Sequence, residues 1–207
     1  MNDAIEDPLK DEIAISRLLK DWGLWRDTGK WVRLLSAYAP DASMKTTWFD
    51  GSAKDFVEAS ERLAGKGALV QHFIGPSTIE VCKLRAIAET RVILLVRDAI
   101  NDVPVDVTCY GRFVDRLVKQ QGLWFIQTRI PIYEKDCIAP VQPGAVPHFD
   151  TDVLAAYPMG YRHLAYLQAR AGATIVTDIP EHNSDAQRAL YASASQWLFE
   201  ATEGNQT

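Results

Sequence analysis

One histidine stands out as a residue that could carry out acid–base chemistry. His72 lies inside the alternating run ALVQHFIGPST at residues 68–78, which predicts a β-strand. The ordinary pKa of an imidazole is about 6.5, so a neutral histidine can accept a proton near neutral pH. The residue types alone leave two interpretations open: a satisfied histidine in a packed core, or the general base of an active site. If His72 faces a cavity, strand alternation places Val70 and Ile74 on the same side.

The sequence signatures of several other chemistries are absent. The chain contains no GxSxG nucleophile motif, no HExxH zinc motif and no GxxxxGK[ST] phosphate loop. Its three cysteines, Cys82, Cys109 and Cys137, show no CxxC spacing, which argues against a zinc site and suits a reducing compartment. We therefore expect chemistry that needs neither a cofactor nor a metal.

Helical periodicity dominates the part of the chain that precedes His72. Apolar residues recur at helical spacing in three segments, and Pro40 is expected to end the second of them. The expected helices are residues 8–26, residues 30–38 and a segment that follows Asp50-Gly51-Ser52 and reaches Leu63, with a short strand at 43–49.

After residue 67 the apolar period changes from about 3.6 to about 2, which predicts long antiparallel strands. Gly75-Pro76 marks a bulge or bend in the first strand, and residues 120–122 form a tight hairpin turn before the last. The expected strands are residues 68–83, 85–99, 103–119 and 123–136. Helices followed by a run of strands indicate an α+β fold, in which one sheet buries its face by curling around the helices.

The residue composition of the chain changes again at about residue 139. A proline-rich segment leads to two further expected helices, at 150–171 and 183–201. We interpret residues 1–138 as the α+β domain and residues 139–207 as a mostly helical C-terminal extension. The extension is expected to pack on the main domain or on a partner subunit and to close over the mouth of a pocket.

Composition limits the classes of partner. The chain has 207 residues, 47% of them hydrophobic and 24% charged, and a net charge of −5, which argues against nucleic-acid binding. No stretch approaches the ~20 apolar residues of a membrane span, and the acidic start MNDAIEDPLKDE does not resemble a signal peptide. We therefore expect a cytoplasmic protein with a small-molecule partner.

Three blocks of sequence resemble a known family. The blocks WGLWRDTGKWVRLLSAYAPDA, QHFIG and GLWFIQTR are similar to the SnoaL-like branch of the nuclear transport factor 2-like fold, closest in motif to scytalone dehydratase and hexachlorocyclohexane dehydrochlorinase. The similarity covers residues 8–137. It implies a cone-shaped, curved mixed sheet wrapped around three N-terminal helices (a cystatin-like roll). It also implies a homo-oligomer, a dimer or a trimer.

The resemblance also implies roles for particular residues. The family pairs an aspartate at the end of the first helix with a histidine on the facing strand, and these positions hold Asp27 and His72 here. Trp22 matches a pocket tryptophan, and Arg129 matches an arginine on the last strand. Four positions depart from scytalone dehydratase, which implies the same type of chemistry on a different substrate. They are Arg26 and Thr46 in place of two tyrosines, Arg97 in place of a second histidine, and Phe113 at about the place of an asparagine.

Together these observations predict a cofactor-independent lyase of the dehydratase type. His72 would act as base, Asp27 would orient it, and Arg129 would stabilise negative charge. The expected substrate is a hydrophobic, aromatic small molecule. The residues expected to contact it are Trp22, Trp25, Thr46, Phe73, Arg97, Phe113 and Tyr133.

Other readings of the same residues stay open. Asp27 can be a turn residue at a helix end, Arg129 a structural ion-pair residue, and Tyr133 a packing residue. The same base could serve carbon–carbon cleavage that releases an aldehyde, or an isomerase or polyketide-type cyclase. A non-catalytic small-molecule-binding protein is a further alternative, because a fold does not determine a function.

Overall fold

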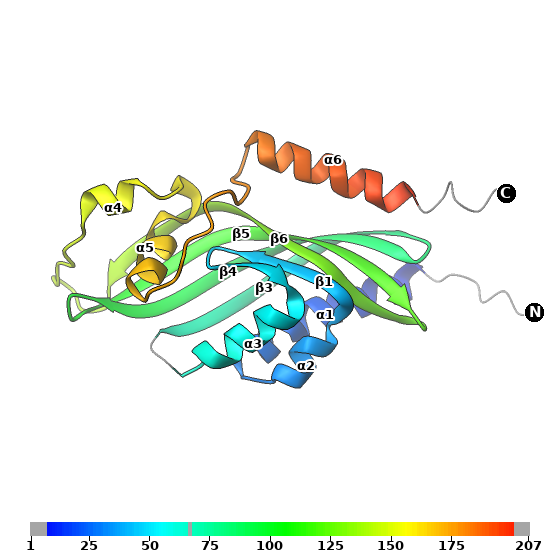
Figure 1. Cartoon of the computed structure of the whole chain (residues 1–207), viewed down its shortest axis with the longest axis horizontal. Coiled ribbons are helices and arrows are strands. Elements are labelled where there is room, and N and C mark those ends of the chain that lie inside the picture. Colours follow the sequence, from blue (N-terminus) through cyan, green and yellow to red (C-terminus); the bar gives the residue numbers. More distant parts are fainter. Residues whose placement is uncertain (1–7, 66–67, 201–207) are drawn as a thin grey trace, which may run out of the picture.

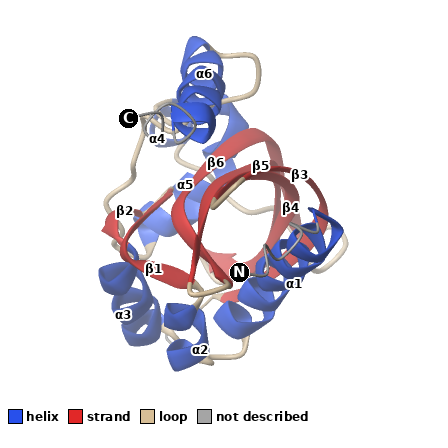
Figure 2. Cartoon of the chain, turned by 90° about the vertical axis from the view of Figure 1, so that its right-hand side faces the viewer, coloured by secondary structure: helices blue, strands red, loops and turns tan. Residues whose placement is uncertain are grey.

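The computed structural model describes residues 8–65 and 68–200 as helices around one curled sheet (Figures 1 and 2). Residue 201, the expected last residue of the C-terminal helix, lies outside the described residues. So do residues 1–7 of the expected domain at 1–138 and residues 201–207 of the expected extension at 139–207. The helices are α1 Pro8–Asp27, α2 Trp31–Ser36, α3 Ala53–Leu63, α4 Thr151–Ala155, the 3-10 helix η1 Met159–Tyr161, α5 Arg162–Arg170 and α6 Asp185–Glu200.

The sheet has six strands in the order β2-β1-β6-β5-β4-β3. It is mixed, because β1 and β6 run parallel whereas the other neighbouring strands are antiparallel. The strands are β1 Tyr38–Thr46, β2 Phe49–Ser52, β3 Leu69–Cys82, β4 Arg85–Ile100, β5 Val103–Gln120 and β6 Leu123–Pro140. The sheet curls strongly without closing, and α1, α2 and α3 lie together along its open side (Figure 2). The expected α+β fold with a curved mixed sheet is confirmed.

Two predicted turns also agree with the structure. The pairing of β3 with β4 shifts register between Ile74 and Ser77, as Gly75-Pro76 predicts. The turn between β5 and β6 has positive φ at Gln121 (51°) and Gly122 (81°), the conformation of a type I′ hairpin.

Four predicted element boundaries are wrong. The second helix ends at Ser36, and a strand rather than a helix end contains Pro40, where β1 shifts register along β6 and can tolerate a residue without an N–H. The single strand expected at 43–49 is split by a turn, and β2 takes the place of the expected turn at 50–52. The helix expected at 150–171 is broken before Pro158, because proline disfavours helical backbone at the residue that precedes it. The last strand continues beyond 136 to Pro140.

The interior contains two apolar clusters on the same sheet. One packs α1 and α3 against the strands, and its fully buried members include Ile15, Leu19 and Leu117. The other packs the extension against β4 and β5, with Val107, Tyr161 and Leu164 among its members. The extension therefore shares the sheet with the three N-terminal helices, while the division into two domains remains a prediction.

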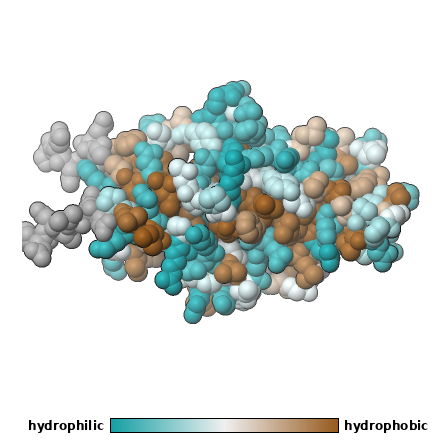
Figure 3. Space-filling model, turned by 180° about the vertical axis from the view of Figure 1, so that it is seen from behind, coloured by the Kyte–Doolittle hydropathy of each residue, from teal (hydrophilic) through white to brown (hydrophobic). Residues whose placement is uncertain are grey.

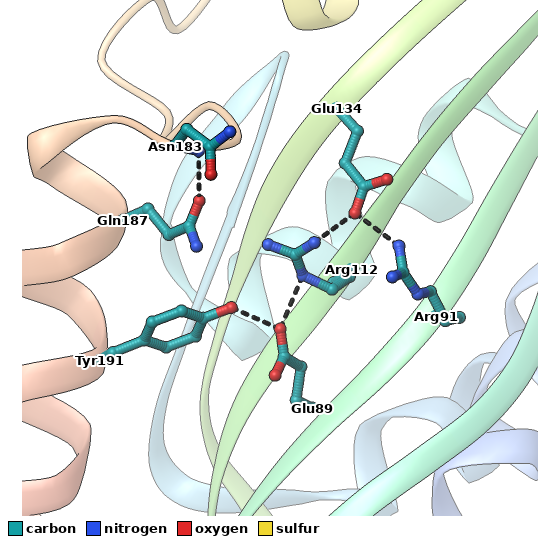
Figure 4. Close-up of polar contacts among 7 residues, drawn as sticks. All are labelled: Glu89, Arg91, Arg112, Glu134, Asn183, Gln187 and Tyr191. Carbon is teal, nitrogen blue, oxygen red and sulfur yellow. Dashed lines mark hydrogen bonds and ion pairs between the residues drawn. The ribbon is translucent and has the colours of Figure 1, made fainter.

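The last helix, α6, lies on the side of the sheet opposite α1–α3 (Figure 1). Its Tyr191 hydroxyl donates a hydrogen bond of 2.5 Å to Glu89 on β4. Glu89 and Glu134 flank the nearly buried guanidinium of Arg112 (Figure 4). Trp197 of the same helix lies under Arg85, with 4.8 Å between the guanidinium carbon and the ring centroid. Polar and cation–π contacts thus attach α6 to the sheet.

The opposite view of the molecule has a band of apolar side chains (Figure 3). The exposed apolar residues of β3 and β4 include Leu69, Phe73 and Leu95. Of the described helices, none is long and apolar enough to cross a membrane. The expected homo-oligomer and cytoplasmic location remain predictions.

Candidate active site

Asp27 and His72 meet in the structure. One carboxylate oxygen of Asp27 lies 2.6 Å from Nδ1 of His72, and the other accepts the backbone N–H of His72 at 2.7 Å. The side chains are only 14% and 12% exposed. Because an ionised carboxylate only accepts hydrogen bonds, Nδ1 carries the proton, and Nε2 is left as the acceptor.

The end of α1 determines where Asp27 lies. The helix stops at Asp27 because Gly29 adopts a φ of +67°, and Lys30 then returns a backbone hydrogen bond of 2.9 Å to Trp25. The last turn of α1 also approaches β3 very closely at Gly23. A Cβ atom at this position would lie 2.6 Å from Cγ1 of Ile74, so only glycine permits this approach without a shift. This contact brings the helix end to the strand that carries His72.

The surroundings of the pair favour a neutral imidazole. Burial lowers the pKa of His72 below its ordinary value, Asp27 opposes this effect, and the positive charges of Arg26 and Arg129 act with it. Trp22 packs its ring edge-on to the imidazole, with 5.5 Å between ring centroids. At neutral pH the histidine is therefore unprotonated at Nε2 and available as a base.

A cavity of about 120 Å³ lies beside the pair. Five of the predicted site residues line it: Trp22, Thr46, His72, Phe113 and Tyr133. Val70 lines it as well, as alternation from His72 predicts, whereas Ile74 is directed to Gly23. Most of the wall is apolar, which suits a hydrophobic ligand.

Several lining residues were not predicted from the sequence. Arg26 was identified only as a departure from the family pattern. The others are Met44, Trp48, Phe56, Ala68, Val92, Leu94, Val96, Asp98, Cys109, Leu167, Gln168 and Ala171. Alternation along β4 could have placed Val92, Leu94 and Val96 on one face, but nothing in their spacing indicates which face is concave.

Three of the predicted contact residues do not line this cavity, so the structure gives no support to their predicted role. Phe73 is 62% exposed, because it follows His72 directly and a strand turns successive side chains to opposite faces. Arg97 forms an exposed ion pair with Asp106, with two contacts of 2.7 Å. Trp25 packs against the apolar core and is not among the residues that line the cavity.

Arg129 lies behind the cavity wall rather than in it. It is 1% exposed and forms two hydrogen bonds, of 2.7 and 2.8 Å, with Asp115. Its guanidinium carbon is 4.2 Å from the ring centroid of Trp22 and 4.5 Å from that of Phe113, two residues that line the cavity. Arg129 is therefore not among the residues that line the cavity, and its role in stabilising negative charge stays a prediction. Its positive charge can therefore act on the cavity only electrostatically, across the rings of Trp22 and Phe113.

Part of the C-terminal extension covers the cavity. Leu167 and Gln168 of α5, with Ala171 just beyond it, belong to the lining. The Thr47 hydroxyl donates a hydrogen bond of 2.5 Å to the Gln168 side chain, and the backbone N–H of Val176 donates to Thr47 at 2.9 Å. Within the described residues, the extension thus lies over the cavity of its own chain.

No described cluster of His, Cys, Asp or Glu could hold a metal ion. The geometry provides a buried carboxylate–imidazole pair, one free imidazole nitrogen on a cavity-lining residue, and apolar walls with a guanidinium among them. Such an arrangement can remove a proton from carbon.

Comparison with known proteins adds further findings. The SnoaL-like domain family model matches residues 7–130. "Pea pathogenicity protein 2" of Fusarium vanettenii is 34% identical over an alignment covering 95% of this chain and 91% of that protein. Two solved structures share the fold, each with a TM-score of 0.54. A candidate scytalone dehydratase of Novosphingobium aromaticivorans is 18% identical, over an alignment that covers 69% of this chain and 95% of that protein. A hexachlorocyclohexane dehydrochlorinase is 14% identical, over an alignment that covers 69% of this chain and 97% of that protein.

Proposed function

The chain belongs to the SnoaL-like domain family, and from that premise we propose that it is a cofactor-independent lyase of the dehydratase type. The observation that carries the proposal is the buried Asp27–His72 pair, because Nε2 of His72 is free on a residue that lines an apolar cavity. The named dehydratase and dehydrochlorinase among the structures of like fold support the same class of reaction.

The proposed reaction is an elimination. Nε2 of His72 removes a proton from a carbon next to a carbonyl, and the C–H electron pair becomes part of a new carbon–carbon double bond. The leaving group on the adjacent carbon departs with its bonding electrons. In a dehydration the proton on His72 returns to the departing hydroxide, so that water is released and the imidazole is regenerated.

Asp27 has two tasks in this scheme. It holds the His72 proton on Nδ1, which fixes the tautomer with Nε2 free, and it stabilises the imidazolium that forms. Its second oxygen is held by the backbone N–H of His72, so the carboxylate cannot turn away. A positioned general base of this kind contributes about 10²–10⁴-fold in rate.

The cavity supports a substrate class as well. Trp22, Trp48, Phe56 and Phe113 supply aromatic walls, and a volume of about 120 Å³ is of the order needed for a single ring. A hydrophobic, aromatic small molecule therefore remains the proposed substrate.

The test uses a panel of aromatic β-hydroxy ketones incubated in D₂O. We expect the wild-type protein to convert a member of the panel with loss of water, seen as a new enone absorbance and by mass. His72→Gln should lower this rate about 10²-fold or more relative to the wild type. Asp27→Asn should also lower the rate, but by a smaller factor.

Either variant retaining the wild-type rate would remove the pair from the mechanism. Deuterium uptake next to the carbonyl without loss of water would assign the same base to an isomerase or cyclase instead. The aldehyde-releasing reaction would be recognised by the released fragment.

A further inference from the structure

Arg26 is a charged residue in the cavity that the proposed elimination does not yet use. It immediately precedes Asp27 on the last turn of α1 and lines the same cavity as His72. Its guanidinium carbon lies 5.7 Å from the ring centroid of Trp31 and 6.0 Å from that of Phe56. Aromatic faces therefore hold the guanidinium.

No described residue forms an ion pair with the Arg26 guanidinium or accepts a hydrogen bond from it. Two arginines of the sheet, by contrast, have carboxylate partners: Arg129 has Asp115, and Arg97 has Asp106. The nearest formal counter-charge in sequence, Asp27, already uses both oxygens on His72. The N–H groups of Arg26 are therefore available to a ligand.

The partial burial of Arg26 also favours the binding of an anion. Burial lowers the pKa of Arg26, while Asp27 opposes the effect at a distance. An arginine nevertheless stays protonated across the physiological pH range. A charged group that is partly removed from water and lacks a hydrogen-bonded counter-ion gains from binding an anion.

We propose that Arg26 is the anion-binding residue of the cavity and that the substrate is an apolar, ring-sized molecule carrying a carboxylate. The planar guanidinium matches the two oxygens of a carboxylate, and such pairs are the stronger class of hydrogen bond. Arg26 and Asp27 are consecutive on one helix end. The carboxylate of the substrate is thus held by the same rigid element that orients the base.

This inference rests on the proposed function only in taking the cavity as the substrate site. It needs no proton transfer, so it can be tested by equilibrium binding. The probes are sodium benzoate and benzamide, which have nearly the same shape but differ in charge. Isothermal titration calorimetry of the full chain gives both affinities without turnover.

We expect wild-type protein to bind benzoate about 10- to 100-fold more tightly than benzamide, the range that charge-assisted hydrogen bonds provide. Arg26→Met should bring the two affinities within about twofold, mainly by weakening the binding of benzoate. Arg26→Lys should keep part of the preference and guards against a folding defect in the Met variant. Arg33→Met, which removes an exposed charge on the neighbouring helix, is the matched control and should behave as wild type.

Two further arms separate this inference from the proposed function. His72→Gln should keep the benzoate preference, because the neutral imidazole does not supply the charge. The preference should also stay constant from about pH 7 to about pH 9, since Arg26 remains charged, His72 stays neutral, and burial raises the pKa of the lining groups Cys109 and Tyr133. The carboxylate among the lining residues is Asp98.

Equal affinities for the two probes in wild type, or no measurable binding of benzoate, would overturn the inference. A preference that survives Arg26→Met would also overturn it. A preference that disappears as the pH rises, or in His72→Gln, would assign anion binding to the imidazolium of His72 instead of Arg26.

Discussion

The close approach of α1 to β3 at Gly23 allows a sharp test of what brings Asp27 to His72. A Cβ atom at Gly23 would lie 2.6 Å from Cγ1 of Ile74, 3.3 Å from its Cδ1 and 3.5 Å from the carbonyl oxygen of His72. The first of these separations is far below normal contact. Gly23→Ala must therefore displace either Ile74 or the last turn of the helix.

Two opposing effects determine the free energy of unfolding of Gly23→Ala. Alanine in a helix interior is favoured over glycine by about 1 kcal/mol. Overpacking a close contact costs about 1–3 kcal/mol. Because the clash involves Cγ1, which is attached near the strand backbone, we expect the upper part of that range. The net result is a loss of about 1–2 kcal/mol.

The assay combines urea unfolding with histidine NMR. Gly23→Ala should lengthen the contact between Asp27 and the imidazole, so the pKa of His72 should fall further once the opposing effect of Asp27 weakens. The control is the double-mutant cycle with Ile74→Ala, which removes the clashing atoms at its own cavity cost. In that background, Gly23→Ala should be neutral or stabilising and should leave the pKa of His72 where Ile74→Ala alone leaves it.

A Gly23→Ala protein that is about 1 kcal/mol more stable than wild type, with an unchanged imidazole titration, would refute this reasoning. Helix propensity would then be the dominant effect, and the position of Asp27 would not depend on close packing at Gly23.

Ionisable groups provide three further predictions. Because the pKa of His72 in the folded chain is lowered, the rate constant kcat/KM should rise with pH through a midpoint below about 6.5, and the NMR titration of His72 should show the same midpoint. The same lowered pKa makes the free energy of unfolding fall as the pH drops below about 6.5, because the unfolded chain then binds a proton that the folded chain does not. Urea unfolding of His72→Gln should lack this part of the pH dependence. An unaltered pH dependence in the variant would contradict the lowered pKa. Asp115→Asn should lower the free energy of unfolding by about 3–5 kcal/mol, because it leaves the Arg129 guanidinium buried without its partner charge. Asp115→Leu combined with Arg129→Met should cost much less, since it removes both charges. Equal losses in the two proteins would show that the loss in Asp115→Asn does not come from the broken ion pair.

The local periodicity of the chain was sufficient to predict most of the fold. The strands from β3 onward, the bulge at Gly75 and the hairpin before β6 follow from period-2 alternation and from residues that accept unusual backbone conformations. Prediction failed where proline had two possible meanings. Pro40 can end a helix or lie at a strand irregularity, and only the register of β1 on β6 decides between them.

The candidate site divides in the same way. Sequence and family resemblance together indicated Asp27 and His72, because a helix end and a strand position are local features. They could not show that the neighbouring Phe73 faces out of the cavity, that Arg129 lies behind Trp22 and that no described carboxylate forms a hydrogen bond or ion pair with Arg26. The curvature of the sheet, the packing of α1 at Gly23 and the placement of α5 over the cavity decide these points. Each depends on contacts between residues far apart in the chain, which no local pattern encodes.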